Sequence, residues 1–90
     1  MTFTWDPQKD AVNRRKHAVG FHEAASVLED PLSTTYPAPA HSHGEQRYVT
    51  IGRSRLGRTL VVAHADRGDT IRIISARPAT RRERRFYEEG

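Results

Sequence analysis

Three β-branched runs dominate the second half of this 90-residue chain and constrain its architecture more than any other feature. They extend from Arg47 to Arg53, from Thr59 to Asp66 and from Thr70 to Ala76, and the Val, Ile and Thr residues in them favour extended backbone. The separators, residues 54–57 and 67–69, have the length of hairpin loops and contain glycine. The sequence therefore predicts an antiparallel meander.

Alternation within the last run indicates how this sheet is covered. Alternate residues of a regular strand point to the same side, so Ile71 and Ile73 are expected to share one face with Ser75 and Arg77. Neither face is then purely apolar. We expect one face to be covered by helices and the other to be partly open.

Two helices are predicted before the meander. An Asp-Pro pair is typical of a helix start, so the first helix should run from Pro7 to about His17, after a short strand at Phe3–Trp5. In a second segment, from Phe21 to about Glu29, apolar residues recur with helical spacing. Residues 33–45 are rich in Pro, Ser, Thr and His without a period and are expected to form a loop.

A third helix is predicted after the meander. Pro78 ends the last run, and Thr80 with Glu83 has the spacing of a capping box. The expected order is β-α-α-β-β-β-α. This is an α+β fold in which an antiparallel sheet carries two N-terminal helices and one C-terminal helix, and residues 1–90 form a single domain.

Composition excludes several classes of protein. The chain has no cysteine, no basic and apolar leader, and no apolar run long enough for a membrane span, so we expect a cytoplasmic protein without membrane contact. Its six glycines are dispersed, so no nucleotide cradle and no cofactor are predicted. His41, His43 and His64 could be imagined around a metal, but no acidic cluster completes the ligands, and we expect no metal site.

The remaining feature is a basic cluster around the last strand and helix. The chain carries 15 Lys and Arg against 11 Asp and Glu, and arginine pairs bidentately with phosphate. The candidate cations are Arg77, Arg81, Arg82 and Arg85, joined by Arg47, Arg53 and Lys16. The plainer interpretation is a solvated helix face with i,i+4 pairs, Arg84 with Glu88 and Arg85 with Glu89.

Such a cluster suits RNA, and RNA can be cleaved without a metal. The 2′-hydroxyl attacks the adjacent phosphate if a base takes its proton, cations stabilise the developing charge, and an acid serves the leaving oxygen. Arg77, Arg81 and Arg82 would bind the phosphate, and His17, His64 or Tyr87 would move protons. Two alternatives use the same arginines: a nucleic-acid-binding module without catalysis, and an interaction protein that meets an acidic partner.

Four motifs carry a resemblance to a known family. They are N-x-x-K-H-x-V-x-F-x-E-A from Asn13, Asp30-Pro31, R-x-V-x-I-G from Arg47, and I-S-A-R-x-A-x-x-x-E-x-x-x-Y from Ile74 to Tyr87. In this order they resemble the BrnT toxins of bacterial type II toxin–antitoxin modules. The glycine that commonly follows the Lys-His pair is Ala18 here, which leaves only the turn geometry after the first helix in question.

The resemblance implies a RelE-like fold and a ribonuclease that cleaves mRNA, free or on the ribosome, and arrests growth. It implies neutralisation by a BrnA-like antitoxin with a ribbon-helix-helix domain, through which alone the complex would contact operator DNA. The family's catalytic cations match Arg53, Arg77 and Arg81 or Arg82, and its aromatic residue matches Tyr87. Lys16 and His17 match a family signature.

Overall fold

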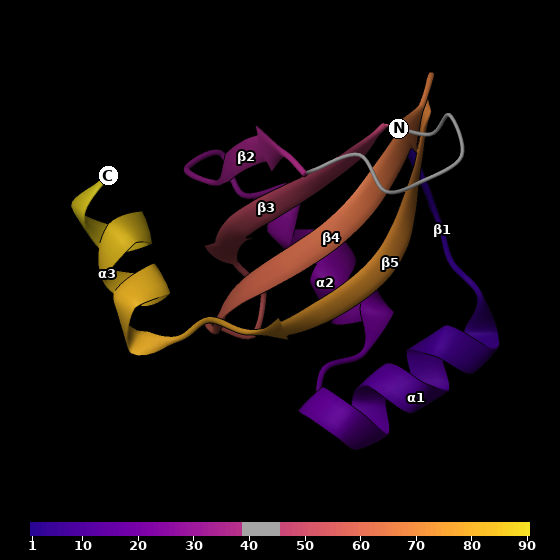
Figure 1. Cartoon of the computed structure of the whole chain (residues 1–90), viewed down its shortest axis with the longest axis horizontal. Helices are drawn as coiled ribbons and strands as arrows, with labels where there is room; N and C mark the ends of the chain where they lie inside the picture. Colours follow the sequence, from indigo (N-terminus) through magenta and orange to yellow (C-terminus); the bar gives the residue numbers. More distant parts are fainter. Residues whose placement is uncertain (39–45) are drawn as a thin grey trace.

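The computed structural model describes residues 1–38 and 46–90 and has the predicted α+β architecture (Figure 1). Its elements are, in chain order, β1 (Thr2–Thr4), α1 (Pro7–His17), α2 (Phe21–Val27), β2 (Thr34–Pro37), β3 (Arg47–Arg53), β4 (Thr59–Arg67), β5 (Thr70–Pro78) and α3 (Arg81–Glu89). No helix in these two described segments is long and apolar enough to cross a membrane.

The five strands form one sheet in the order β1-β5-β4-β3-β2. The predicted meander of β3, β4 and β5 is confirmed, while β1 pairs parallel with β5 and makes the sheet mixed rather than antiparallel. The prediction of a loop throughout residues 33–45 was wrong at its start, because β2 lies there and adds one strand to the predicted order. Thr34, Thr35 and Tyr36 favour a strand, and Pro37 is tolerated because β2 is an edge strand.

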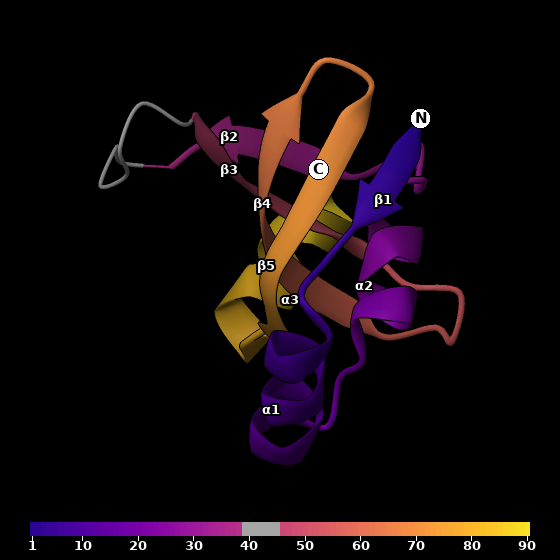
Figure 2. The same ribbon diagram turned by 90° about the vertical axis from the view of Figure 1, so that its right-hand side faces the viewer.

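The two faces of the sheet are covered unequally. On one face, α2 packs against β3, β4 and β5, and Phe21, Val27, Leu60, Val62 and Ile73 are almost fully buried between them. On the other face, Ile51, Val61 and Ala79 form a smaller cluster that α3 covers through Tyr87. Figure 2 shows α2 and α3 on opposite sides of the sheet. The second face is therefore the partly open one that the sequence predicts.

A β-bulge decides which residues of β5 reach the open face. Ser75 pairs with Ala63, but the next pair is Ile73 with His64, so Ile74 has no partner. The expectation that Ile73 shares a face with Arg77 was therefore wrong: one extra residue inverts the alternation. Ile73 stays in the main core, and Arg77 lies on the open face.

Asn13 fixes α1 along β5. Its buried side chain donates to the carbonyls of Val19, at 2.9 Å, and Ala76, at 2.7 Å, and accepts the Ala76 amide at 3.2 Å. Every polar atom of this side chain is thus bonded, as a buried amide requires. The contact holds the C-terminal end of α1, with Lys16 and His17, beside β5.

Helix α1 ends at a residue in an unusual conformation. Ala18 is the C-cap, with φ 58° and ψ 33°, and its amide donates to the Arg14 carbonyl at 3.0 Å. It is the one non-glycine residue with positive φ in the described part of the chain. This left-handed conformation suits glycine, the residue that the resembled family commonly has there.

Candidate active site

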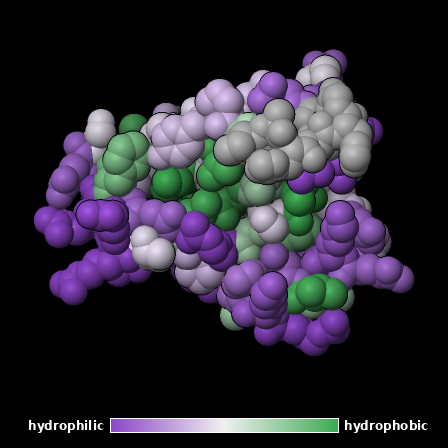
Figure 3. Space-filling model, in the orientation of Figure 1, coloured by the Kyte–Doolittle hydropathy of each residue, from purple (hydrophilic) through white to green (hydrophobic). Residues whose placement is uncertain are grey.

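A groove on the open face brings several of the predicted residues together. Two cavities, of about 240 and 350 Å³, share Val49, Val61 and Arg77, and we call their union the sheet groove. The first is also lined by His17, Ala63, Ser75 and Ala76, and the second by Tyr36, Ile51, Arg82, Glu83 and Phe86. In Figure 3, apolar surface is visible in the hollow of this face, between hydrophilic side chains.

Arg77 lines both cavities of the sheet groove. It is half-exposed, at the end of β5, where it pairs across the sheet with Val61. Its two terminal nitrogens donate to the two carboxylate oxygens of Glu83, at 2.8 and 2.9 Å. The guanidinium is thereby held in one orientation, because a bidentate pair fixes the plane of the fork.

Glu83 also helps to cap the N-terminal end of helix α3. Its carboxylate accepts the Thr80 amide at 2.8 Å, and its own amide donates to the Thr80 hydroxyl at 3.2 Å, so the predicted capping box is confirmed. The hydrogen bonds from Arg77, which outweigh the opposing effect of burial, lower the pKa of Glu83 from 4.5 to about 2. Glu83 is therefore an anion at neutral pH.

His17 and Arg82 each line one of the two cavities that Arg77 lines. His17, at the C-terminal end of α1, is half-buried and lines the smaller cavity with Arg77. Arg82, in the first turn of α3, is exposed and lines the larger cavity. The groove thus combines an imidazole with two guanidinium groups, and of the two arginines only Arg77 is paired with a carboxylate among the described residues.

Tyr87 has a different environment from the one predicted for a proton carrier. Its ring packs on the small cluster with Ile51 and Val61, and its hydroxyl donates to the Asp30 carboxylate at 2.6 Å. This hydrogen bond, together with burial, raises the pKa of Tyr87. The structure does not bring the hydroxyl to the cavities that Arg77 lines; it ties α3 to the turn after α2.

His64 lies on the opposite side of the sheet. It is 2% exposed and takes part in a polar chain: its Nδ1 is 2.7 Å from Asp66, its Nε2 is 2.8 Å from the Thr50 hydroxyl, and that hydroxyl is 2.7 Å from Thr35. The structure therefore does not bring His64 together with Arg77. This series of hydrogen bonds links β2, β3 and β4. The sequence indicated the side on which His64 lies, because His64 alternates with Leu60 and Val62, which face the helix α2.

The other predicted arginines do not line the sheet groove. Arg81 and Arg85 are exposed and line, with Arg82, Phe86 and Glu89, a separate cavity of about 520 Å³ on α3. Arg53 pairs with Glu88 at 3.5 Å and lies 5.7 Å from the centre of the Tyr87 ring, while Arg47 is half-buried at the start of β3.

The two predicted i,i+4 pairs of α3 had different outcomes. Arg85 lies 3.8 Å from Glu89, as expected. Arg84 does not pair with Glu88, because its guanidinium donates to the Ala79 carbonyl at 3.1 Å and Glu88 meets Arg53 instead. Arg84 thus bonds the chain segment that precedes its own helix.

Two aromatic residues near the groove are not among the site residues that the sequence predicts. Tyr36, on β2, lies with its ring 6.2 Å from that of Phe86, which is 50% exposed on α3. Both line the larger cavity. From the sequence, Tyr36 is a possible stacking residue, but its place on a strand was not predicted because residues 33–45 were expected to form a loop.

The histidines considered for a metal are only partly within the described structure. His41 and His43 lie outside the described residues. Among residues 1–38 and 46–90, no three His, Cys, Asp or Glu side chains gather closely enough to hold a metal ion.

Comparisons with known proteins agree with the fold and identify the family. A family model described as the ribonuclease toxin BrnT of type II toxin–antitoxin systems matches residues 5–83. A 1.1 Å crystal structure of the Brucella abortus ribonuclease toxin BrnT superposes with a TM-score of 0.71, over 90% of this chain and 99% of that one, at 24% identity. No curated protein matches the chain significantly. Because the family model spans most of its length, this chain belongs to the BrnT family of ribonuclease toxins of type II toxin–antitoxin systems.

Proposed function

We propose that this chain is an endoribonuclease that cleaves mRNA by attack of the RNA's own 2′-hydroxyl, without a metal. The observation that carries the proposal is that His17 and Arg77 line one cavity on the open face. An imidazole can take a proton near neutral pH, and a guanidinium can bind the phosphate that is attacked.

Each group then has a defined task. His17 removes the proton of the 2′-hydroxyl, whose oxygen forms a bond to the adjacent phosphorus. The bond to the 5′-oxygen breaks, and water protonates that oxygen, which leaves a 2′,3′-cyclic phosphate and a 5′-hydroxyl. Arg77 and Arg82 stabilise the charge of the phosphorane, so the step needs no Lewis acid. Neither His64 nor Tyr87 has a part, because the imidazole of the first and the hydroxyl of the second are hydrogen-bonded elsewhere.

The aromatic end of the groove would bind a base. Tyr36 and Phe86 line the cavity that also holds Arg77 and Arg82. Unpaired bases stack on exposed aromatic rings, whereas the bases of a duplex are not available for this. A single-stranded segment of mRNA, free or on the ribosome, is the substrate that fits, which also implies action in the cytoplasm.

Neutralisation by an antitoxin follows from the family, and we propose a BrnA-like partner with a ribbon-helix-helix domain. Carboxylates of such a partner would meet the guanidinium groups of Arg81 and Arg82 on α3, which have no carboxylate partner among the residues that the structure describes. Operator DNA would be contacted only through that partner. The toxin would then have no DNA-binding task of its own.

The test is the toxicity of Arg77→Ala on expression in a bacterial host. We expect growth arrest to be relieved while the circular dichroism spectrum and antitoxin binding are retained. Arg55→Ala is the matched control and should remain toxic, because Arg55 is exposed and lies outside both the sheet groove and the cavity on α3. Full toxicity of Arg77→Ala would refute the assignment. RNA binding by the wild-type chain without any cleavage products would favour the non-catalytic binding module.

A further inference from the structure

A further cavity lies beside α1 and adjoins the sheet groove. It measures about 420 Å³, and its lining includes Lys9, Val12, Lys16, His17, Ile74 and Ser75. His17 and Ser75 also line the smaller cavity of the sheet groove. The three cavities therefore lie next to one another between α3 and α1, and we call the one beside α1 the α1 cavity.

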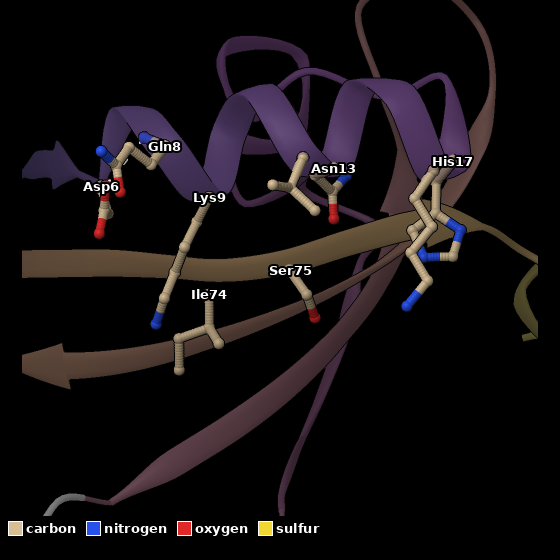
Figure 4. A pocket seen from close by; sticks show the side chains of 9 residues that line it. Asp6, Gln8, Lys9, Asn13, His17, Ile74 and Ser75 are labelled. Atoms are coloured by element: carbon tan, nitrogen blue, oxygen red, sulfur yellow. Dashed lines mark hydrogen bonds between the residues drawn. The ribbon is translucent and has the colours of Figure 1, made fainter.

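The β-bulge shapes the floor of the α1 cavity. Ile74 is the residue of β5 that has no cross-strand partner, so its half-buried side chain is available to line this cavity. In Figure 4, Lys9 extends from α1 across β5 toward Ile74. Val12, which is 50% exposed, lines the same cavity. Bulges commonly redirect side chains next to functional sites.

The charges at the α1 cavity favour an anion. Lys9 and Lys16 are exposed, and neither has a carboxylate within ion-pair distance in the part of the chain that the structure describes. The acidic residue of the lining, Asp6, is used at the start of α1, where its carboxylate accepts the Gln8 amide at 2.8 Å. An apolar floor with a cationic rim matches a nucleotide, which has an apolar base face and an anionic phosphate.

We infer that the α1 cavity is a subsite for a nucleotide that flanks the cleavage point of single-stranded RNA. Lys9 and Lys16 bind its phosphate, and Val12 and Ile74 contact its base. The inference rests on the proposed ribonuclease function, and it extends the proposed path of the bound RNA. The strand would run from the aromatic pair on β2 and α3, over Arg77, to the cavity beside α1.

The experiment measures binding of oligonucleotides that cannot be cleaved. Fluorescein-labelled single-stranded RNA with 2′-O-methyl groups, of about three and about nine nucleotides, is titrated with the purified chain and followed by anisotropy. The test variant is Lys9→Ala/Lys16→Ala. The control is Arg15→Ala/Arg55→Ala, which removes the same charge from exposed positions outside the three cavities.

The expected result depends on oligonucleotide length. The test variant should bind the long RNA about tenfold more weakly than wild type and the short RNA equally well, and its salt dependence should fall by about 0.7 in log–log slope, as the loss of one neutralised phosphate implies. The control variant should bind the long RNA more tightly than the short RNA by the same factor as wild type does. Equal affinity of the test and control variants for the long RNA overturns the subsite, and so does an absence of RNA binding by wild type.

Failure of the subsite and failure of the ribonuclease are distinguishable. If the wild-type chain binds methylated RNA with the expected dependence on length and Lys9 but does not cut unmodified RNA, the subsite stands and the proposed chemistry falls. If it cuts unmodified RNA while the lysine variant binds both lengths as wild type does, only the subsite falls.

Discussion

The guanidinium of Arg77 and the carboxylate of Glu83 form a bidentate ion pair, with contacts of 2.8 and 2.9 Å. The same carboxylate accepts the Thr80 amide that begins α3. One side chain thus couples the start of a helix to the orientation of a cation in the sheet groove. Substrate phosphate must compete with Glu83 for part of the donors of Arg77, or bind to those that remain.

Glu83→Gln should separate the orientation of Arg77 from its charge. The amide can still accept the Thr80 amide, but the neutral side chain no longer fixes the guanidinium as firmly. We expect kcat for RNA to fall about tenfold while KM is unchanged or lower, because Arg77 keeps its charge. Thr80→Ala is the control, since it weakens the helix start by about 1 kcal/mol and leaves the ion pair in place. A variant Glu83→Gln with wild-type kcat would contradict a positioning role.

Acid should destabilise the chain in part through Glu83. Its pKa in the folded chain is lowered from 4.5 to about 2, so the carboxylate contributes stability that is present above pH 4.5 and is lost as the pH falls to about 2. Urea unfolding across this window should show a decline in the free energy of unfolding. The decline should be smaller in Glu83→Gln, and an identical decline in both proteins would contradict the ion pair.

Tyr87→Phe should affect stability more than catalysis. The hydroxyl donates to Asp30, and a hydrogen bond to a charged group contributes about 1.5–3 kcal/mol, so we expect unfolding to become easier by about 1–2 kcal/mol at this half-buried position. The cleavage rate per folded molecule should stay within about twofold of the wild-type rate, because the Tyr87 hydroxyl takes no part in the proposed chemical step. A loss of about a hundredfold in kcat would instead identify Tyr87 as a proton carrier.

Ala18→Gly should stabilise the chain. Ala18 has φ 58°, where a side chain crowds the backbone, and glycine removes that strain at some cost in chain entropy. We expect a net gain of about 1 kcal/mol in the free energy of unfolding and a midpoint in urea that is higher. A lower midpoint would show that the turn between α1 and α2 depends on the methyl group.

Features with a local cause could be predicted from the sequence. The bounds of α1 follow from its Asp-Pro start and its polar end, and the capping box at Thr80 follows from a spacing of three residues. The meander follows from composition and short loops. Arg77 and His17 are candidates on sequence grounds as well, because their residue types suit phosphate binding and proton transfer.

Features that depend on distant partners could not be predicted in the same way. Asp30 and Tyr87 are 57 residues apart, and no local sequence pattern around either residue predicts their hydrogen bond. The bulge at Ile74 inverts the alternation of β5 and arises from pairing with β4. His64 is a different case. Its place on the helix side could have been predicted, because side chains alternate along β4 and His64 falls in step with Leu60 and Val62.

In the proposed reaction, RNA is cleaved by its own 2′-hydroxyl, without a metal, at the groove that holds His17 and Arg77. The most direct measurement incubates the purified chain with single-stranded RNA in excess EDTA and identifies the ends of the products by mass spectrometry, with Arg77→Ala in parallel. We predict 2′,3′-cyclic phosphate and 5′-hydroxyl ends from the wild-type chain and no products above background from the variant. Products with 5′-phosphate ends, loss of cleavage in EDTA, or equal cleavage by Arg77→Ala would contradict the account.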